Sequence, residues 1–379
     1  MVYLDNSATT PVCPQAAEAA LQMMTENFGN PSSLHTLGIR AEESLADTRA
    51  RLADTIGCTP AEITFTSGGT EANNLAILGA AIARQRRGRH IVVSAIEHAS
   101  VSAPIERLEQ QGFEVTRVLP QADGRILPAD VLSACRADTV LVSVMLVNNE
   151  TGAVFPMDRV AAKIRKIAPL AALHIDAVQA VGKIPVNVKK LDADLLTVSG
   201  HKLYAPKGVG ALYCRKGVRL TPPSALGGGQ EKSLRSGTEN TAGIAAFGAA
   251  LAALPTTAES AAHYSALRQH LLERLNGRSE IRWHLPEDGV PYIVNFSVMG
   301  LRSETLIHFL AEREIYLSGG SACSKGHLSP VLTAMGLPAE EIDSALRVSF
   351  GKDNTTDDVD KLADALADAI QTLTKRRAL

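Results

Sequence analysis

Two residues in this chain could carry covalent chemistry, and they lie far apart in the sequence. Lys202 ends the run Ser-Gly-His-Lys directly after an apolar, strand-like segment. A lysine beside a pocket is partly desolvated, which lowers its pKa and makes the neutral amine available to form a Schiff base. The alternative is an ordinary lysine on the protein surface. Cys323 stands in the run 318–327, Ser-Gly-Gly-Ser-Ala-Cys-Ser-Lys-Gly-His, with no second cysteine nearby. Its thiol is therefore predicted to be accessible, without a local disulfide or zinc partner.

A second group of residues would bind rather than react. Asp176 closes the strand-like segment 172–176, where a buried carboxylate needs a cationic partner such as a protonated pyridine nitrogen. The alternative is an aspartate that caps the next helix. In the run 66–71, Thr-Ser-Gly-Gly-Thr-Glu, a strand leads into two glycines and a hydroxyl residue, which favours a phosphate cradle at Gly69 and Thr70. The run is neither a Walker loop nor GxGxxG, and Thr70 could simply cap the helix.

Three further polar side chains follow or interrupt apolar strands. His98 follows the segment 91–94, where an imidazole could stack on a flat cofactor and shuttle protons, although a lone histidine is more often structural. Asn149 follows an almost wholly apolar segment. Arg347 lies inside a strand-like run and needs an anion, either a substrate carboxylate or a structural partner. Together, the cradle, the imidazole, the carboxylate and the lysine predict a pyridoxal 5′-phosphate site.

The elements that must position these residues alternate between strands and helices. Apolar strands bounded by helices indicate an α/β fold with a mostly parallel sheet that is buried on both faces. The break at Leu254-Pro255 divides the chain. We predict a large cofactor-binding domain at 15–254 and a smaller α+β domain formed by 1–14 and 255–379. The expected strands of the large domain are 63–66, 91–94, 114–119, 139–146, 172–176, 195–199 and 208–214.

The composition argues against several classes of protein. The chain has 379 residues, of which 45% are hydrophobic, and its 38 basic residues nearly balance 40 acidic ones. That balance argues against direct contact with nucleic acid. No apolar run approaches the roughly 20 residues of a membrane span, and the N-terminus does not resemble a secretory signal. Five scattered cysteines have no disulfide or metal-site spacing, so we expect no metal and a reducing, cytoplasmic location.

With these residues assembled, the chain closely resembles the cysteine desulfurases, the NifS/IscS-like branch of the class-V aminotransferase-fold enzymes. The likeness runs from residues 3–10 to the strand of Arg347 and so covers nearly the whole chain. The resemblance implies the type I fold of pyridoxal-phosphate-dependent transferases, with a sheet of seven strands, and a homodimer with active sites at the interface. The motifs that carry it are Phe28-Gly29-Asn30-Pro31-Ser32-Ser33, Thr66–Glu71, Val147-Asn148-Asn149-Glu150, Asp176 with Gln179, Ser199–Lys202, Arg235-Ser236-Gly237-Thr238 and Ser321-Ala322-Cys323.

The resemblance also implies a role for each matching residue. Lys202 would hold the cofactor as a Schiff base, and His98 would stack on its ring. Asp176 would pair with the ring nitrogen and Gln179 with the ring hydroxyl. Asn149 would lie against the cofactor and orient the substrate, whose carboxylate Arg347 would take. The cofactor's phosphate would be held by Gly69, Thr70, Ser199, His201 and, from the neighbouring subunit, Thr238.

These roles predict that L-cysteine loses its sulfur, that L-alanine leaves, and that Cys323 carries the sulfur as a persulfide to an acceptor protein. The Lys202 amine, alone or with His98, would remove the α-proton. Residues 324–330 depart from the family pattern, which leaves the acceptor open: an iron–sulfur scaffold, a tRNA-thiolation enzyme or a pathway that places sulfur in DNA. The alternatives are a selenocysteine lyase or another pyridoxal-phosphate-dependent β-lyase or aminotransferase, and a sulfur-carrier scaffold without turnover.

Overall fold

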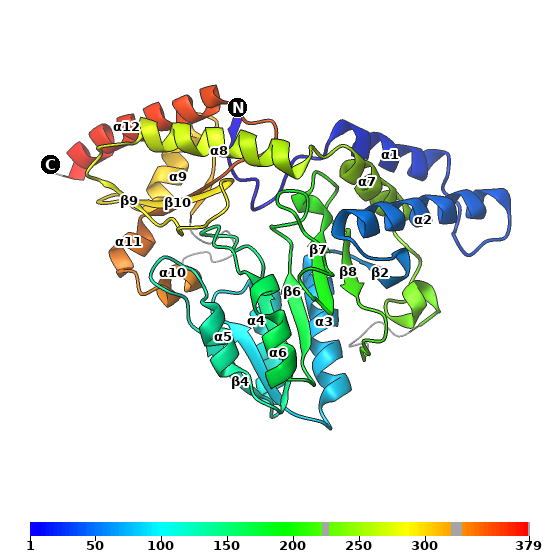
Figure 1. Cartoon of the computed structure of the whole chain (residues 1–379). Helices are drawn as coiled ribbons and strands as arrows, with labels where there is room; N and C mark the ends of the chain where they lie inside the picture. Colours follow the sequence, from blue (N-terminus) through cyan, green and yellow to red (C-terminus); the bar gives the residue numbers. More distant parts are fainter. Residues whose placement is uncertain (222–226, 320–327, 378–379) are drawn as a thin grey trace.

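A seven-stranded sheet forms the centre of the chain, whose computed structural model describes residues 1–221, 227–319 and 328–377 (Figure 1). The strand order is β2-β8-β7-β6-β5-β3-β4. Strands β3 to β7 pair in parallel, whereas β8 runs antiparallel to both of its neighbours. The expected seven-stranded, mostly parallel sheet is therefore confirmed. Its strands are β2 (Ile63–Thr66), β3 (His90–Ser94), β4 (Glu114–Val118), β5 (Thr139–Met145), β6 (Ala172–Asp176), β7 (Leu195–Ser199) and β8 (Gly210–Cys214).

Both faces of this sheet are covered by helices because its strands are apolar on both sides. Ile91 and Val93 of β3 pack with α3 (Gly69–Arg84) and α4 (Ala99–Gln110), whereas Val92 between them joins the larger apolar cluster on the other face. That cluster includes residues of α5 (Pro128–Ala134) and α6 (Ala161–Ile167). Parallel strands buried in this way place all their carboxyl ends at one edge, where α/β folds bind ligands.

The chain forms a second sheet, which is antiparallel. In Figure 1 it lies below α8 (Thr257–Arg274) and α12 (Thr356–Arg377). Its order is β12 (Ser318–Gly319), β13 (Ala345–Ser349), β10 (Ile293–Val298) and β9 (Ile281–Trp283), and α9 (Ser303–Ala311) packs beside it. The N-terminal β1 (Val2–Tyr3) pairs in parallel with β11 (Ile315–Tyr316), so the chain's first residues join the C-terminal region. The short helices α10 (Pro330–Ala334) and α11 (Ala339–Asp343) follow β12 in the sequence. The domain boundary predicted at 254/255 falls between α7 (Thr241–Ala252) and α8, and the division stays a prediction.

Three helices pack together on the opposite side of the molecule from α12: α1 (Pro14–Thr25), α2 (Thr36–Ile56) and α7 (Figure 1). Gly248 allows α7 to approach α2 closely, since a Cβ there would lie 2.3 Å from Thr48 Oγ1. Within the described part of the chain, no single helix is long and apolar enough to cross a membrane. Helices α7 and α8 reach that length and apolar character only when taken together, and their axes are bent by 76° relative to each other.

Candidate active site

A cavity of about 420 Å³ opens at the carboxyl ends of the parallel strands, a size typical of small-molecule sites. Residues that follow or end β3, β5, β6 and β7 line it, together with Ser7, Ala8 and Arg347 from the two ends of the chain. Ten residues singled out from the sequence meet at this cavity: Gly69, Thr70, His98, Asn149, Asp176, Gln179, Ser199, His201, Lys202 and Arg347.

One end of the cavity is built to receive an anion. The N-terminus of α3 begins there at Gly69, and Gly68 before it adopts a φ of 153° that favours glycine. A Cβ on Gly69 would lie 3.0 Å from Val178 Cγ2, so only glycine leaves this space open. The Ser199 hydroxyl is buried and has no hydrogen-bond partner among the described residues. A helix N-terminus and an unsatisfied hydroxyl fit a phosphate group.

A buried carboxylate lies at the middle of the cavity. Asp176 is 5% exposed, and its oxygens accept hydrogen bonds from Val178 N at 3.0 Å and from Asn73 Nδ2 at 2.8 Å. No ion pair to Asp176 exists within the described part of the chain. Because a buried carboxylate is costly without a cation, this site suits a ligand that carries a protonated ring nitrogen.

Lys202 reaches the same cavity from the short turn that follows β7. Its Nζ donates to the backbone oxygens of Ser7 at 2.5 Å and Ala8 at 2.7 Å. Gln179 Nε2 donates to the same Ser7 oxygen at 2.9 Å. The N-terminal segment therefore holds the lysine amine and the glutamine amide side by side at the pocket, with neutral carbonyls as their acceptors.

Two histidines lie on the lining. His98 begins α4 as its N-cap, and its Nδ1 lies 2.8 Å from Ser100 Oγ. Burial lowers the pKa of His98 and the Lys202 charge lowers it further, whereas Asp176 acts in the opposite direction. His201 Nδ1 lies 3.2 Å from Thr9 Oγ1, and burial, with the Lys202 charge, lowers its pKa to about 4. Both imidazoles are therefore neutral at physiological pH.

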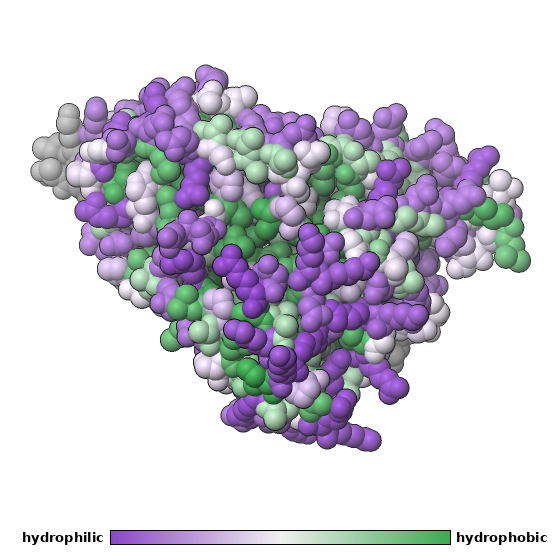
Figure 2. Space-filling view, in the orientation of Figure 1, coloured by the Kyte–Doolittle hydropathy of each residue, from purple (hydrophilic) through white to green (hydrophobic). Residues whose placement is uncertain are grey.

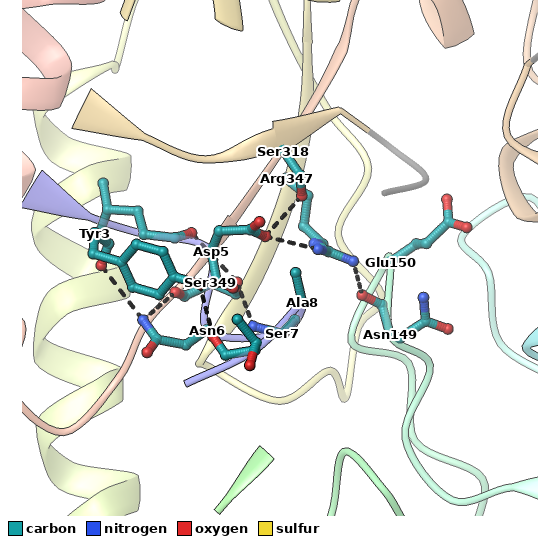
Figure 3. Close-up of polar contacts among 12 residues, drawn as sticks. Tyr3, Asp5, Asn6, Ser7, Ala8, Asn149, Glu150, Ser318, Arg347 and Ser349 are labelled. Carbon is teal, nitrogen blue, oxygen red and sulfur yellow. Dashed lines mark hydrogen bonds and ion pairs between the residues drawn. The ribbon is translucent and has the colours of Figure 1, made fainter. Parts of the chain in front are cut away.

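Arg347 lines the cavity from β13 and is only 2% exposed (Figure 3). Its Nη2 pairs with Asp5 Oδ1 at 2.9 Å, and its Nη1 donates to the backbone oxygen of Asn149 at 2.9 Å. Its Nε is buried and has no partner among the described residues. The guanidinium is thus held in place on one side and retains N–H groups that can bind a carboxylate.

The comparisons with known proteins agree with this geometry. The family described as aminotransferase class-V matches residues 2–362. The chain belongs to the class-V aminotransferase family.

Relatives in this family are desulfurases by name. Cysteine desulfurase IscS of Methanosarcina thermophila is 43% identical, over 98% of this chain and 92% of its own. The solved structure titled "NIFS-LIKE PROTEIN" superposes with a TM-score of 0.92 at 35% identity and covers 98% of this chain and 99% of its own. The structure titled "SspA in complex with cysteine" has a TM-score of 0.81 at 35% identity and covers 92% of this chain and 99% of its own.

Class-V aminotransferases and these relatives imply pyridoxal 5′-phosphate, and the residues present fit that group. The N-terminus of α3 and the unpaired Ser199 hydroxyl suit its phosphate. The carboxylate of Asp176, which lacks a cationic partner among the described residues, suits its ring nitrogen. Lys202 lies on the same lining and supplies a primary amine.

Two buried glutamates of the lining, Glu97 and Glu150, had no role predicted for them from the sequence. Burial raises the pKa of Glu97 to about 8, and its Oε1 accepts from Met145 N at 2.8 Å and from the Ser94 hydroxyl. Burial raises the pKa of Glu150 to about 7, and its Oε2 accepts from Ser329 Oγ at 2.5 Å. Each follows an apolar strand and adjoins a predicted site residue, which is the sequence signal that could have identified them.

Two predicted site residues do not line the cavity. Thr238 is exposed in the loop before α7. Cys323 lies outside the described residues. The described residues on either side of it are close to the pocket, because Ser318 pairs with Arg347 in the sheet and Pro330 lies on the lining.

The four described cysteines are unsuited to nucleophilic chemistry at this site. None of them lines the cavity, and Cys13 is buried. Burial raises the pKa of Cys58 to about 12, and of Cys135 and Cys214 to about 11, so these thiols stay protonated at neutral pH.

Proposed function

We propose that this chain is a pyridoxal 5′-phosphate-dependent cysteine desulfurase, which converts L-cysteine into L-alanine and leaves a persulfide on Cys323. The observation that carries the proposal is the meeting of Lys202, Asp176 and Arg347 at one cavity. An amine, an acceptor for a protonated ring nitrogen and a guanidinium for a carboxylate are what an amino acid and this cofactor require. The named desulfurases among the relatives support the substrate.

Pyridoxal phosphate would be held by Asp176, Gln179 and the N-terminus of α3, with Lys202 within reach. When bound, it supplies a ring that takes up negative charge from the substrate's α-carbon. Arg347 binds the carboxylate of L-cysteine and Asn149 orients the amino acid. The Lys202 amine accepts the α-proton. The Cys323 thiolate would then attack the substrate sulfur, and the new S–S bond takes its electrons from Cys323. The electrons of the broken C–S bond go to the β-carbon, which takes up a proton and becomes the methyl group of alanine.

The direct test is to incubate the purified protein with L-cysteine and measure alanine and protein-bound persulfide. We expect equal amounts of both in a single turnover. Cys323→Ala should bind cofactor and substrate yet form no persulfide, and the matched Cys58→Ala should behave as the unchanged protein. Undiminished sulfide release by Cys323→Ala would refute the assignment.

The same assay separates the alternatives. A selenocysteine lyase would show a far higher kcat/KM for L-selenocysteine than for L-cysteine. An aminotransferase would form a keto acid instead of alanine, and a β-lyase would form pyruvate. A scaffold without turnover would form no alanine even after addition of pyridoxal phosphate.

We further propose that the active unit is a homodimer. Large apolar side chains are exposed together near the connection between α1 and α2, and hydrophobic surface gathers at that end of the molecule in Figure 2. An exposed apolar group of this kind is typical of an interaction surface. These residues are Leu21, Met24, Phe28, Leu34 and Ile39.

Thr238, exposed in one chain, would then complete the phosphate site of the other. This contribution can be tested by mixing two inactive variants, Lys202→Ala and Thr238→Val, so that mixed dimers form, and then measuring desulfurase activity. If Thr238 acts across the interface, the mixed dimer holds one intact site and recovers activity. If it acts within its own subunit, mixing restores nothing.

The sulfur acceptor is proposed to be another protein, either an iron–sulfur scaffold or a tRNA-thiolation enzyme, in the cytoplasm. The relatives named IscS support the first. Free thiols at all four described cysteines are typical of a reducing compartment. Loading the protein with ³⁵S-labelled L-cysteine and adding each purified candidate would identify the acceptor by transfer of label, and fractionation of the cells would test the location.

A further inference from the structure

A chain of hydrogen bonds connects the buried carboxylate to the imidazole beside it. Asn73, which is fully buried, places Nδ2 at 2.8 Å from Asp176 Oδ2 and also at 2.8 Å from Ser100 Oγ. Ser100 Oγ lies in turn 2.8 Å from His98 Nδ1.

The direction of every bond in this chain is fixed by chemistry. An ionised carboxylate only accepts hydrogen bonds, so the Asn73 atom that faces Asp176 must be nitrogen. The same nitrogen donates its second hydrogen to Ser100 Oγ. This orientation leaves Asn73 Oδ1 buried without a partner among the described residues, whereas the reversed amide would place that oxygen against the Asp176 carboxylate.

The Ser100 hydroxyl receives the hydrogen of Asn73, so its own hydrogen points to His98 Nδ1. The backbone N–H of Ser100 also donates to Nδ1, at 3.1 Å, because His98 caps the N-terminus of α4. Two donors therefore converge on one ring nitrogen. A proton on Nδ1 would oppose both of them, and the neutral ring must carry its hydrogen on Nε2.

The other side of the ring faces the ligand. Within the described chain no hydrogen-bond partner contacts Nε2, and His98 lies on the lining of the cavity. Burial is the largest influence on the pKa of His98 and lowers it; the Asp176 charge opposes this and the Lys202 charge adds to it, so the net direction favours the neutral imidazole. An N–H group is therefore available to a molecule in the cavity.

We infer that Asn73 and Ser100 are positioning residues that hold His98 as the neutral imidazole with its proton on Nε2. The tautomer depends on the hydrogen bonds alone. Its consequence deepens the proposed function and rests on it: in the resting enzyme His98 offers the ligand a hydrogen-bond donor at Nε2 and no lone pair that could accept a proton, so the α-proton goes to the Lys202 amine.

The inference can be tested by NMR of the holoenzyme with ¹⁵N-labelled histidine, with the His98 signals assigned by their loss in His98→Gln. At neutral pH we expect Nδ1 to show the shift of an unprotonated nitrogen and Nε2 that of a protonated one. In Ser100→Ala both shifts should move toward the average of the two tautomers, and kcat should fall roughly tenfold while KM stays within about twofold. Ser100→Thr, which keeps the hydroxyl, should restore both, and Ser102→Ala on the same helix should change neither.

A protonated Nδ1, a doubly protonated ring at neutral pH or unchanged shifts in Ser100→Ala would overturn the inference. Because the NMR measurement does not depend on turnover, its outcome is separate from that of the proposed function. The expected shifts in a protein that forms no alanine would uphold the tautomer and refute the desulfurase.

Discussion

A single oxygen of Asp5 binds both Arg347 and Ser318. Oδ1 lies 2.9 Å from Arg347 Nη2 and 2.9 Å from Ser318 Oγ (Figure 3). The N-terminal segment thus holds the guanidinium that is proposed to bind the substrate's carboxylate. It also anchors β12, the strand that leads toward Cys323 in the sequence.

The charge of Asp5 should stabilise the enzyme most when no substrate is bound. Asp5→Asn keeps the shape but leaves the buried Arg347 without a counter-ion, so the free energy of unfolding should fall by about 3 kcal/mol. A bound carboxylate would replace the missing charge. L-alanine should therefore raise the melting temperature of Asp5→Asn more than that of the unchanged holoenzyme. The control is Asp123→Asn, whose partner Arg125 is partly exposed, and equal shifts in all three proteins would contradict the prediction.

Arg347 should distinguish substrates by their carboxylate. Arg347→Lys keeps the charge but loses the planar fork, so kcat/KM for L-cysteine should fall by roughly 30-fold or more, equivalent to about 2 kcal/mol. Cysteamine has the same thiol and amine but no carboxylate, and its turnover should change little. The ratio of the two kcat/KM values is the measurement, with Arg302→Lys at an exposed position as the control. A similar loss for both substrates would indicate a purely structural role.

Glu97 should make the protein less stable as the pH rises. Its folded-state pKa is raised to about 8 by burial, so its stabilising contribution is complete below its ordinary pKa and is lost as pH rises through about 8. Glu97→Gln should therefore gain stability relative to the unchanged protein between about pH 5 and about pH 9, by up to a few kcal/mol at about 1.4 kcal/mol per pKa unit. Urea unfolding at several pH values measures this, beside the exposed Glu18→Gln. Parallel curves for Glu97→Gln and the unchanged protein would disprove it.

Lys183 should show the opposite dependence. It is buried 3.3 Å from Gln179 Oε1 and 5.1 Å from the centre of the Tyr292 ring, and burial, together with the charges of Lys202 and Arg347, lowers its pKa to about 7. Lys183 binds its proton more tightly in the unfolded chain than in the folded one. The free energy of unfolding therefore decreases as pH falls from the ordinary pKa of lysine to about 7.

Lys183→Met should consequently gain stability relative to the unchanged protein at about pH 6 but not at about pH 10. The exposed Lys189→Met provides the matched control in the same unfolding measurements. A gain that is independent of pH would point to better packing of the methionine and not to removal of a buried charge.

Much of the site followed from the sequence because its residues end or follow parallel strands. Asp176, His98, Asn149 and Lys202 are separated by tens of residues, yet alternation of strands and helices brings such positions to one edge of a sheet. The residue types then indicated the chemistry. The role of Cys323 stays a prediction that depends on the sequence and on the family resemblance.

The tertiary structure decided which groups hold these residues. The sequence alone indicated that Arg347 needs an anion, but Asp5 lies 342 positions away and no local pattern connects the two residues. Likewise, Ser7 and Ala8 contribute only backbone oxygens to Lys202, which any residue type could supply. Strand periodicity determines which side chains reach a sheet edge, whereas contacts between the two ends of the chain, and the direction of the bonds from Asn73 to His98, depend on how the whole chain packs.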